Sequence, residues 1–293
     1  MKLVSFGPKG LEKPGVVVDD YVVDDVVIDL LAADPSLPGS IRQILADDAL
    51  DVVRRINADA ASLPEECKHA LRDVRLGPPV TDPSKIVCVG LNYRDHAEEQ
   101  DRKVPDVPLL FGKGPNVLTG DGDSMPIPRG VAELDYEIEL AFVMGRRAKH
   151  VSQEEALGYV AGYSVFMDIT ARDLQRRERQ WLRAKSADGS GPFGPYLVTP
   201  DDVPDAHSLD ISIDVNGETL QASNTGQMFF KTDFLVHFIS QTMTLEPGDV
   251  IATGTPSGVG VFRHPPRYLQ PGDQLVGRIQ ELGTLNCTIA PQD

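Results

Sequence analysis

The clearest structural signal in this chain is the stretch Leu134-Asp135-Tyr136-Glu137-Ile138-Glu139-Leu140-Ala141-Phe142-Val143. Large apolar residues occupy every second position, which is typical of a β-strand because successive side chains of a strand point to opposite faces. The pattern therefore predicts one strand with two different faces. One face carries Leu134, Tyr136, Ile138, Leu140 and Phe142, and the other carries Asp135, Glu137 and Glu139.

The acidic face of this strand requires an explanation. Like charges two residues apart on a strand, about 7 Å between Cα atoms, repel unless water or a cation lies among them. A second apolar segment, residues 161–167, is expected to be a buried strand and ends in Asp168. A solvated outer face is the simpler interpretation, but acids close to buried strands are usually paired or bind a metal. We therefore favour a metal site made by Glu137, Glu139 and Asp168.

The ligand types indicate the kind of ion. Neither Cys nor His lies at ligand spacing within residues 137–168, and His150 has no partner nearby. Carboxylate oxygens select a hard cation, so Mg²⁺ or Mn²⁺ fits best, Ca²⁺ fits second and Zn²⁺ fits poorly. Three protein ligands would leave positions open, which is typical of a catalytic metal site.

Composition and charge limit the partners. The chain has 293 residues, 41% of them hydrophobic, which is enough for one large or two modest domains. A formal net charge of −16 argues against nucleic acid and anionic membranes. A small anionic substrate is compatible with it, because a bound cation and nearby Lys or Arg reverse the sign inside a pocket. Residues 1–8 lack the apolar run of a signal peptide and no stretch has the length of a membrane span, so we expect a cytoplasmic protein.

Two regions are expected along the chain. Gly77-Pro78-Pro79 marks a boundary between a small N-terminal domain, residues 1–76, and a region that holds the chemistry, residues 80–293. The later part is rich in strands, and Asn216-Gly217 after an alternating run is the strongest short-range hairpin signal. Short strands are predicted at 16–18, 21–23 and 26–30, and helices at 40–45, 49–57 and 232–243.

Several enzyme classes are excluded by missing motifs. No Gly-x-Gly-x-x-Gly follows a strand, and no phosphate-binding loop of the Walker type occurs. Residues 254–258, Gly-Thr-Pro-Ser-Gly, place the serine one position too late for a nucleophile elbow. The three cysteines are too few and too scattered for a disulfide framework or a zinc site.

A possible general base lies in residues 89–100, where a buried strand leads into a short polar helix. His96 and Glu99 are three positions apart, so their side chains can touch on a helix. A carboxylate beside a histidine orients the imidazole and raises its basicity, as activation of water requires. A weak surface pair is the alternative interpretation of the same spacing.

Basic residues follow Asp168 in the sequence. A helix is expected to begin after Asp168 and to give way to a glycine-proline loop that carries Lys185. Arg176, Arg177 and Arg179 are interpreted as solvated charges.

Together these segments resemble the fumarylacetoacetate hydrolase family from about Lys85 to Thr288. The N-terminal residues 3–8 and 12–15 also look like the short first domain of the bacterial branch that handles diketo sugar acids. Six motifs in order carry the resemblance: Gly-Leu-Asn-Tyr-Arg-Asp-His-Ala-Glu-Glu, Asp-Tyr-Glu-Ile-Glu-Leu, Met-Asp-Ile-Thr-Ala-Arg-Asp-Leu-Gln, Lys-Ser-Ala-Asp-Gly-Ser-Gly-Pro-Phe-Gly-Pro, Ser-Asn-Thr-Gly-Gln-Met and Thr-Gly-Thr-Pro-Ser-Gly-Val-Gly.

The resemblance implies an α+β fold, with a small N-terminal domain followed by a mixed β-roll or β-sandwich catalytic domain, in a homodimer or a dimer of dimers. It also implies a role for each candidate residue. Mg²⁺ or Mn²⁺ would be held by Glu137, Glu139 and Asp168. The catalytic groups would be a His96/Glu99 dyad on a mobile lid together with Lys185. The substrate would contact Arg172, Gln175, Lys185 and Thr255.

The activity implied is metal-dependent hydrolysis of a carbon–carbon bond in a 2,4-diketo acid of the acylpyruvate type, giving pyruvate-type and carboxylate products. The same site suits an oxaloacetate decarboxylase or an enol–keto isomerase of 2-hydroxy-diene-dioate type, and an inactive metal-binding protein is a further alternative. Ala187 and Ser190 replace the phenylalanines frequent in related sequences, so the acyl half of the substrate stays open. Lys113 is an additional candidate substrate contact, and Asp135 is placed outside the metal ligands.

Overall fold

The computed structural model describes residues 1–19 and 25–292. Within them, twelve strands form one large mixed sheet in which ten follow the order β4-β3-β2-β1-β14-β12-β11-β17-β6-β7. The strand predicted at 21–23 lies outside the described residues. The sheet consists of β1 (Lys2–Phe6), β2 (Lys13–Val18), β3 (Val26–Asp29), β4 (Lys68–Ala70), β5 (Leu76–Gly77), β6 (Ile86–Gly90), β7 (Leu109–Lys113), β8 (Leu118–Thr119), β11 (Ile138–Met144), β12 (Val160–Met167), β14 (Gly191–Val198) and β17 (Val250–Ala252).

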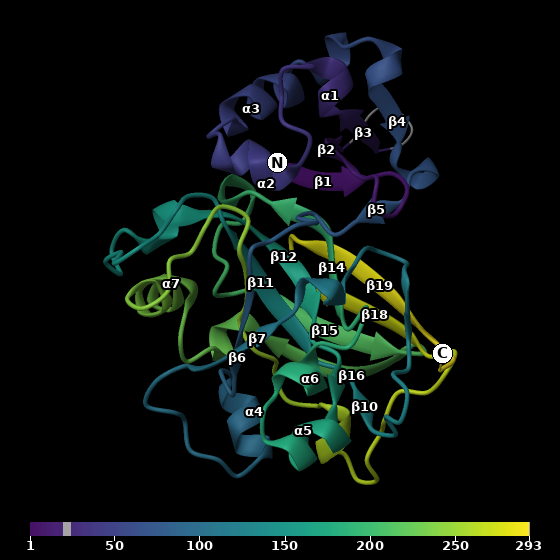
Figure 1. The fold of residues 1–293 in the computed structure, drawn as a ribbon, viewed down its shortest axis with the longest axis vertical. Coiled ribbons are helices and arrows are strands. Elements are labelled where there is room, and N and C mark those ends of the chain that lie inside the picture. The colour runs from purple at the N-terminus through teal and green to yellow at the C-terminus, as the bar shows by residue number, and fades with distance from the viewer. Residues whose placement is uncertain (20–24, 293) are drawn as a thin grey trace.

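A second sheet packs against the middle of the first (Figure 1). The hairpin predicted at Asn216-Gly217 is confirmed, and both residues have the positive φ, 53° and 82°, that a tight hairpin turn requires. At Gly277 a Cβ would lie 2.6 Å from Ile138, so this glycine lets the two sheets approach closely. The strands of this sheet are β9 (Ser124–Pro126), β15 (Asp210–Val215), β16 (Glu218–Asn224), β18 (Gln274–Ile279) and β19 (Gly283–Ala290).

The N-terminal segment lies at one end of the molecule (Figure 1). Its strand β1 pairs with β14, Lys2 opposite Val198, so backbone hydrogen bonds join it to the rest of the chain. One apolar cluster also spans the junction and includes Val16 and Ile28 together with Cys88. The boundary between 1–76 and 80–293 stays a prediction. The helices α1 (Leu30–Ala33), α2 (Ile41–Ala46) and α3 (Leu50–Ala58) belong to this segment.

The strand predicted from Leu134 to Val143 is interrupted, so the prediction of one continuous strand is wrong. It splits into β10 (Leu134–Asp135) and β11. Both strands nevertheless pair with one continuous partner segment in the same register: Leu134 lies opposite Ala171, and Ile138 lies opposite Met167. The N–H of Ile138 points away from this partner segment and donates to the side-chain oxygen of Gln221 at 3.0 Å.

Four helices complete the α+β class expected from the sequence. The helix predicted at 232–243 begins at Thr232 but ends at Ser240. The sequence had placed Lys185 in a loop, but this residue is the last one of a short helix. The helices are α4 (Arg94–Glu99), α5 (Arg172–Glu178), α6 (Leu182–Lys185) and α7 (Thr232–Ser240), and the short strand β13 (Thr170–Ala171) precedes α5.

Candidate active site

Three buried acids meet where β11 begins and β12 ends. The N–H of Asp168 donates to the carbonyl of Glu137 at 2.9 Å, so these residues lie opposite each other, and Glu139 lies two positions further on the same strand. The side chains of Glu137, Glu139 and Asp168 can each offer an oxygen, and these oxygens lie within 4.8 Å of one another. The structure therefore brings together the three acids that the sequence singled out.

Three cations neutralise much of this acidic charge. Nζ of Lys185 donates to Oε2 of Glu137 and Oδ2 of Asp168, at 2.6 Å in both cases. Lys113 donates from the other side to Oδ1 of Asp168 at 2.7 Å. Arg172 bridges Glu137 at 2.5 Å and Asp135 at 2.8 Å. With Asp135 included, four carboxylates face three cations, and all of them are buried.

Glu139 is the carboxylate without a cation. Among residues 1–19 and 25–292, no Lys, Arg or His forms an ion pair with it, and its Oε2 accepts a hydrogen bond from the N–H of Gly254 at 2.9 Å. A buried, unpaired carboxylate is costly. Burial is the main cause that raises the pKa of Glu139 well above its ordinary value, and the nearby carboxylates of Asp168 and Glu137 raise it further. A divalent cation fits this position, because it would add the missing positive charge and all donors are oxygens.

The pKa of Glu137 is shifted in the direction opposite to that of Glu139. Burial favours its neutral form, but Arg172 and Lys185 outweigh burial and hold the pKa of Glu137 below its usual range. Burial likewise favours neutral Lys185, and the carboxylates of Asp168 and Glu137 reverse that effect and raise its pKa. Glu137 and Lys185 are therefore charged at neutral pH.

The predicted histidine–glutamate pair forms on α4. Nδ1 of His96 lies 3.0 Å from Oε2 of Glu99, and Oε1 of Glu99 accepts from the N–H of Gly258 at 2.9 Å. A carboxylate at Nδ1 favours a proton on that nitrogen, so the neutral ring keeps its lone pair on Nε2. The side-chain amide of Gln100 donates to Nε2 at 2.8 Å. These contacts fix the orientation of the His96 ring, so the pair is not a loose surface contact.

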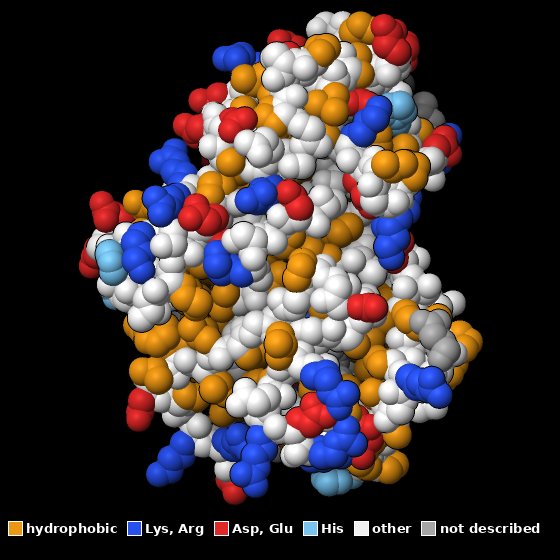
Figure 2. Space-filling view, in the orientation of Figure 1, with side chains coloured by type: hydrophobic (Ala, Val, Ile, Leu, Met, Phe, Trp, Pro, Cys, Tyr) orange, Lys and Arg blue, Asp and Glu red, His pale blue; other side chains and the backbone are white. Residues whose placement is uncertain are grey.

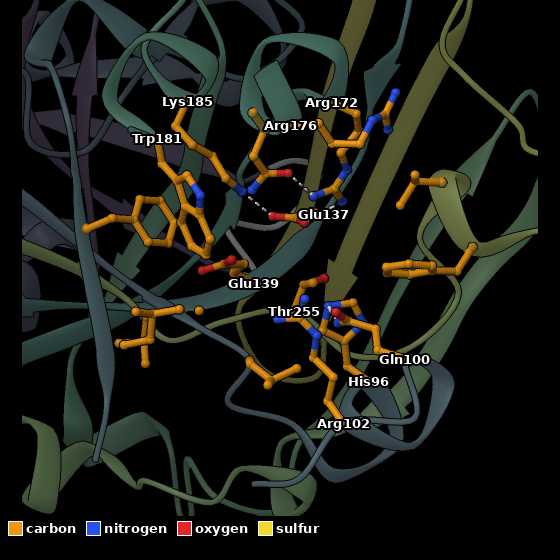
Figure 3. A pocket seen from close by; sticks show the side chains of 18 residues that line it. His96, Gln100, Arg102, Glu137, Glu139, Arg172, Arg176, Trp181, Lys185 and Thr255 are labelled. Carbon is orange, nitrogen blue, oxygen red and sulfur yellow. Dashed lines mark hydrogen bonds and ion pairs between the residues drawn. The ribbon is translucent and has the colours of Figure 1, made fainter. Parts of the chain in front are cut away.

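A cavity of about 370 Å³ lies between the acids and His96. His96, Gln100 and Arg102 line one side of it, and Lys185, Trp181 and Arg172 line the opposite side, with Glu137 and Glu139 also facing the space (Figure 3). Gln175 and Thr255, predicted as substrate contacts, line it as well. Glu99 and Asp168 lie behind the lining residues, each in contact with one of them.

Arg172 and Lys113 are placed differently from simple substrate contacts. The guanidinium of Arg172 is bound to Asp135, Glu137 and Gln175, so it holds the acids and the cavity lining in position. Lys113 is buried behind Asp168, where it also donates to the carbonyl of Ser190 at 3.0 Å, and it does not line the cavity.

Some cavity residues were not found from the sequence. Gln100 lies one helical turn after His96, and this i,i+4 spacing is a signal that could have identified it. Arg176, interpreted as solvated, lines the cavity and pairs with Glu133, although its side chain is 53% exposed. Trp181 packs its ring against Phe111 with 5.2 Å between centroids, and no local pattern pointed to it.

Replacement of Lys113 by methionine should lower the free energy of unfolding by about 3 kcal/mol, because it leaves Asp168 with one buried cation instead of two. Urea unfolding with EDTA present measures the effect. Lys103→Met, an exposed substitution of the same type, is the control and should change stability by less than about 0.5 kcal/mol. Equal stability of the two variants would show that the Lys113–Asp168 pair contributes little.

The convergent acids, the cavity and the oriented histidine are those of an enzyme site suited to a divalent metal. The chain belongs to the fumarylacetoacetate hydrolase family: residues 85–290 match the family model described as Fumarylacetoacetate (FAA) hydrolase C-terminal. This finding confirms the resemblance drawn from the six motifs. The mitochondrial oxaloacetate tautomerase of Rattus norvegicus is 45% identical over 288 residues, covering 97% of this chain and 90% of that protein.

Solved structures give the same family and fold. The fumarylacetoacetate hydrolase of Exiguobacterium antarcticum is 35% identical with a TM-score of 0.83, and the match covers all of both chains. The 5-carboxymethyl-2-hydroxymuconate delta-isomerase of Mycobacterium smegmatis is 30% identical with a TM-score of 0.78, again over all of both chains. In the part of the chain that the structure describes, no helix has the length and apolar character needed to cross a membrane.

Proposed function

We propose that this protein is a metal-dependent tautomerase that interconverts the enol and keto forms of oxaloacetate or a closely related 2-oxo acid. The observation that carries the proposal is the 45% identity with the rat oxaloacetate tautomerase over nearly the whole chain. The site supports it, because tautomerisation needs a base and a stabilised oxygen anion but no attacking water. The alternative activity inferred from the sequence is thus better supported than the hydrolysis of a diketo acid.

The cation site is the first element of the proposed mechanism. A divalent cation held by Glu137, Glu139 and Asp168 would supply positive charge beside the 2-oxo group, where negative charge develops. Lys185 adds a fixed cation on the same side of the cavity. We propose Mg²⁺ or Mn²⁺ because both prefer oxygen ligands.

His96 is the second element. In the keto-to-enol direction Nε2 takes a proton from C3, the C–H electron pair forms the C2=C3 double bond, and the carbonyl electron pair moves onto the 2-oxygen. The 2-oxygen then takes the proton from the imidazolium, so that His96 is neutral again. Glu99 stabilises the imidazolium that forms, because its carboxylate accepts from Nδ1. Gln100 must release Nε2 when substrate enters, since its amide donates to that atom in the structure.

Hydrolysis of a carbon–carbon bond in a 2,4-diketo acid is the second candidate. The same His96/Glu99 pair could activate water against the distal carbonyl, and the similar Exiguobacterium antarcticum structure is that of a fumarylacetoacetate hydrolase. Decarboxylation of oxaloacetate would use the cation site and Lys185 without a water-activating base. The expected homodimer or dimer of dimers and the cytoplasmic location stay predictions. Hydrophobic side chains do gather on the face near α7, which an oligomer could cover (Figure 2).

One substrate panel separates these activities. With Mg²⁺, we expect the protein to accelerate ketonisation of enol-oxaloacetate, followed by ultraviolet absorbance, and to lose this activity in EDTA. Acylpyruvates and a 2,4-diketo sugar acid are assayed for carboxylate release, and oxaloacetate for CO₂. A higher kcat/KM for carboxylate release than for ketonisation would favour the hydrolase, and dominant CO₂ release the decarboxylase. Metal binding without any turnover would identify an inactive metal-binding protein.

A further inference from the structure

We propose that Arg102 binds a carboxylate at the distal end of the substrate, so that the cavity selects dicarboxylic 2-oxo acids over those with a neutral distal end. The proposal rests on the proposed function, because it assigns the second half of the substrate at the same site.

The end of α4 determines where Arg102 lies. Asp101 adopts the left-handed conformation, with φ of 48°, its N–H donates to the carbonyl of Glu98 at 3.0 Å, and the N–H of Arg102 donates to the carbonyl of Ala97 at 2.9 Å. These two bonds form a Schellman motif, in which the left-handed residue ends the helix and turns the chain. Arg102 therefore follows the helix of the His96/Glu99 pair in a fixed turn, and its side chain lies beside His96 (Figure 3).

Arg102 differs from the other cations of the cavity, because no carboxylate in the described part of the chain pairs with it. Lys185 and Arg172 are bound to the buried acids, and Arg176 is paired with Glu133. Among the described residues, Arg102 forms no ion pair, although acids outnumber bases by 44 to 28 in the chain. A guanidinium that lines a cavity without a partner is available for a ligand, and its planar fork suits a carboxylate.

The charges are also arranged in two groups across the cavity. The acids and Lys185, which would receive the 2-oxo acid end, lie on the side opposite Arg102 and His96 (Figure 3). A substrate bound at the acids and extending past His96 would present its far end to Arg102. Lys and Arg side chains gather at the end of the molecule that carries α4 and α5, in a chain with a net charge of −16 (Figure 2). This local positive charge would attract a dianion toward the cavity.

Two ligands that cannot enolise test the assignment without tautomerisation, and CO₂ release is followed in parallel because the dicarboxylate can still decarboxylate. In 3,3-dimethyloxaloacetate the distal group is a carboxylate, and in 3,3-dimethyl-2-oxobutanoate a methyl group replaces it. Calorimetric titration of the Mg²⁺-loaded protein should show about 10-fold tighter binding of the dicarboxylate. Arg102→Met should reduce this ratio to about 2-fold or less, Arg102→Lys should retain part of it, and Lys103→Met, which changes the neighbouring exposed cation outside the cavity, should leave it unchanged.

The outcomes separate this inference from the proposed function. An unchanged ratio in Arg102→Met would overturn the assignment, even if oxaloacetate is tautomerised. A ratio that depends on Arg102 would support it, even if no tautomerisation is detected and the proposed function fails. An equal loss of the ratio in Lys103→Met would also overturn it, because the effect would then come from general surface charge.

Discussion

Replacement of Glu139 by glutamine is expected to weaken Mg²⁺ binding by about 100-fold or more and to remove Mg²⁺-dependent turnover. The loss of a residue outside the ligand shell already costs 10- to 100-fold in typical metal sites, so the loss of a ligand should cost at least that much. Glu139 is also the buried carboxylate that no cation within residues 1–19 and 25–292 balances. Mg²⁺ binding is measured by calorimetry, and turnover by ketonisation of enol-oxaloacetate.

Thermal unfolding gives a second and opposite readout for the same variant. In EDTA, Glu139→Gln should be at least as stable as the wild type, because a neutral amide replaces a buried carboxyl group whose ionisation is disfavoured by burial. With Mg²⁺ at about 100 times its dissociation constant, the wild type should gain about 2.7 kcal/mol and the variant should gain little. Glu154→Gln, which changes an exposed glutamate, is the control and should behave as the wild type. If Glu139→Gln binds Mg²⁺ normally, the three acids are not its ligands.

Replacement of His96 by alanine is expected to reduce turnover by about 10² or more while leaving Mg²⁺ affinity nearly unchanged. The reason is geometric, because His96 faces the cavity from α4 and is bound to Glu99 and Gln100, whereas the acids are held by Lys113, Arg172 and Lys185. Steady-state ketonisation kinetics and Mg²⁺ calorimetry measure the two quantities.

His150→Ala is the matched control for this variant, because His150 is exposed and distant in sequence from α4. It should retain wild-type turnover. Full activity in His96→Ala would remove this residue from the mechanism. If decarboxylation persists in His96→Ala while ketonisation is lost, the two activities use different parts of the site.

The acidic half of the site was predictable because its signal is local. Glu137 and Glu139 stand on an apolar strand and Asp168 ends another, and acids in such positions need a counter-charge whatever the fold. The pairing of His96 with Glu99 was predictable for a similar reason, since three residues make nearly one helical turn. In each case a short stretch of sequence contains the relevant geometry.

The remaining features depend on contacts between distant segments. The N–H of Ile138 is bound by the side chain of Gln221, which follows more than eighty residues later. Lys113 was expected near the substrate, but the pairing of β6 with β7 places it behind Asp168. Such positions are set by strand register, which neither periodicity nor propensity specifies over long sequence separations. Arg102 likewise could be identified as a candidate ligand contact only after the structure showed the carboxylate partners of Lys185, Arg172 and Arg176.

A crystal structure with Mg²⁺ and oxalate, a mimic of the 2-oxo acid end, tests the central claim most directly. We expect Mg²⁺ to be bound by oxygens of Glu137, Glu139 and Asp168, and oxalate to be bound to Mg²⁺ through two oxygens in the cavity between Lys185 and His96. Mg²⁺ at another position, or oxalate bound away from these three acids, would contradict the assignment of this cavity as a metal-dependent site for 2-oxo acids.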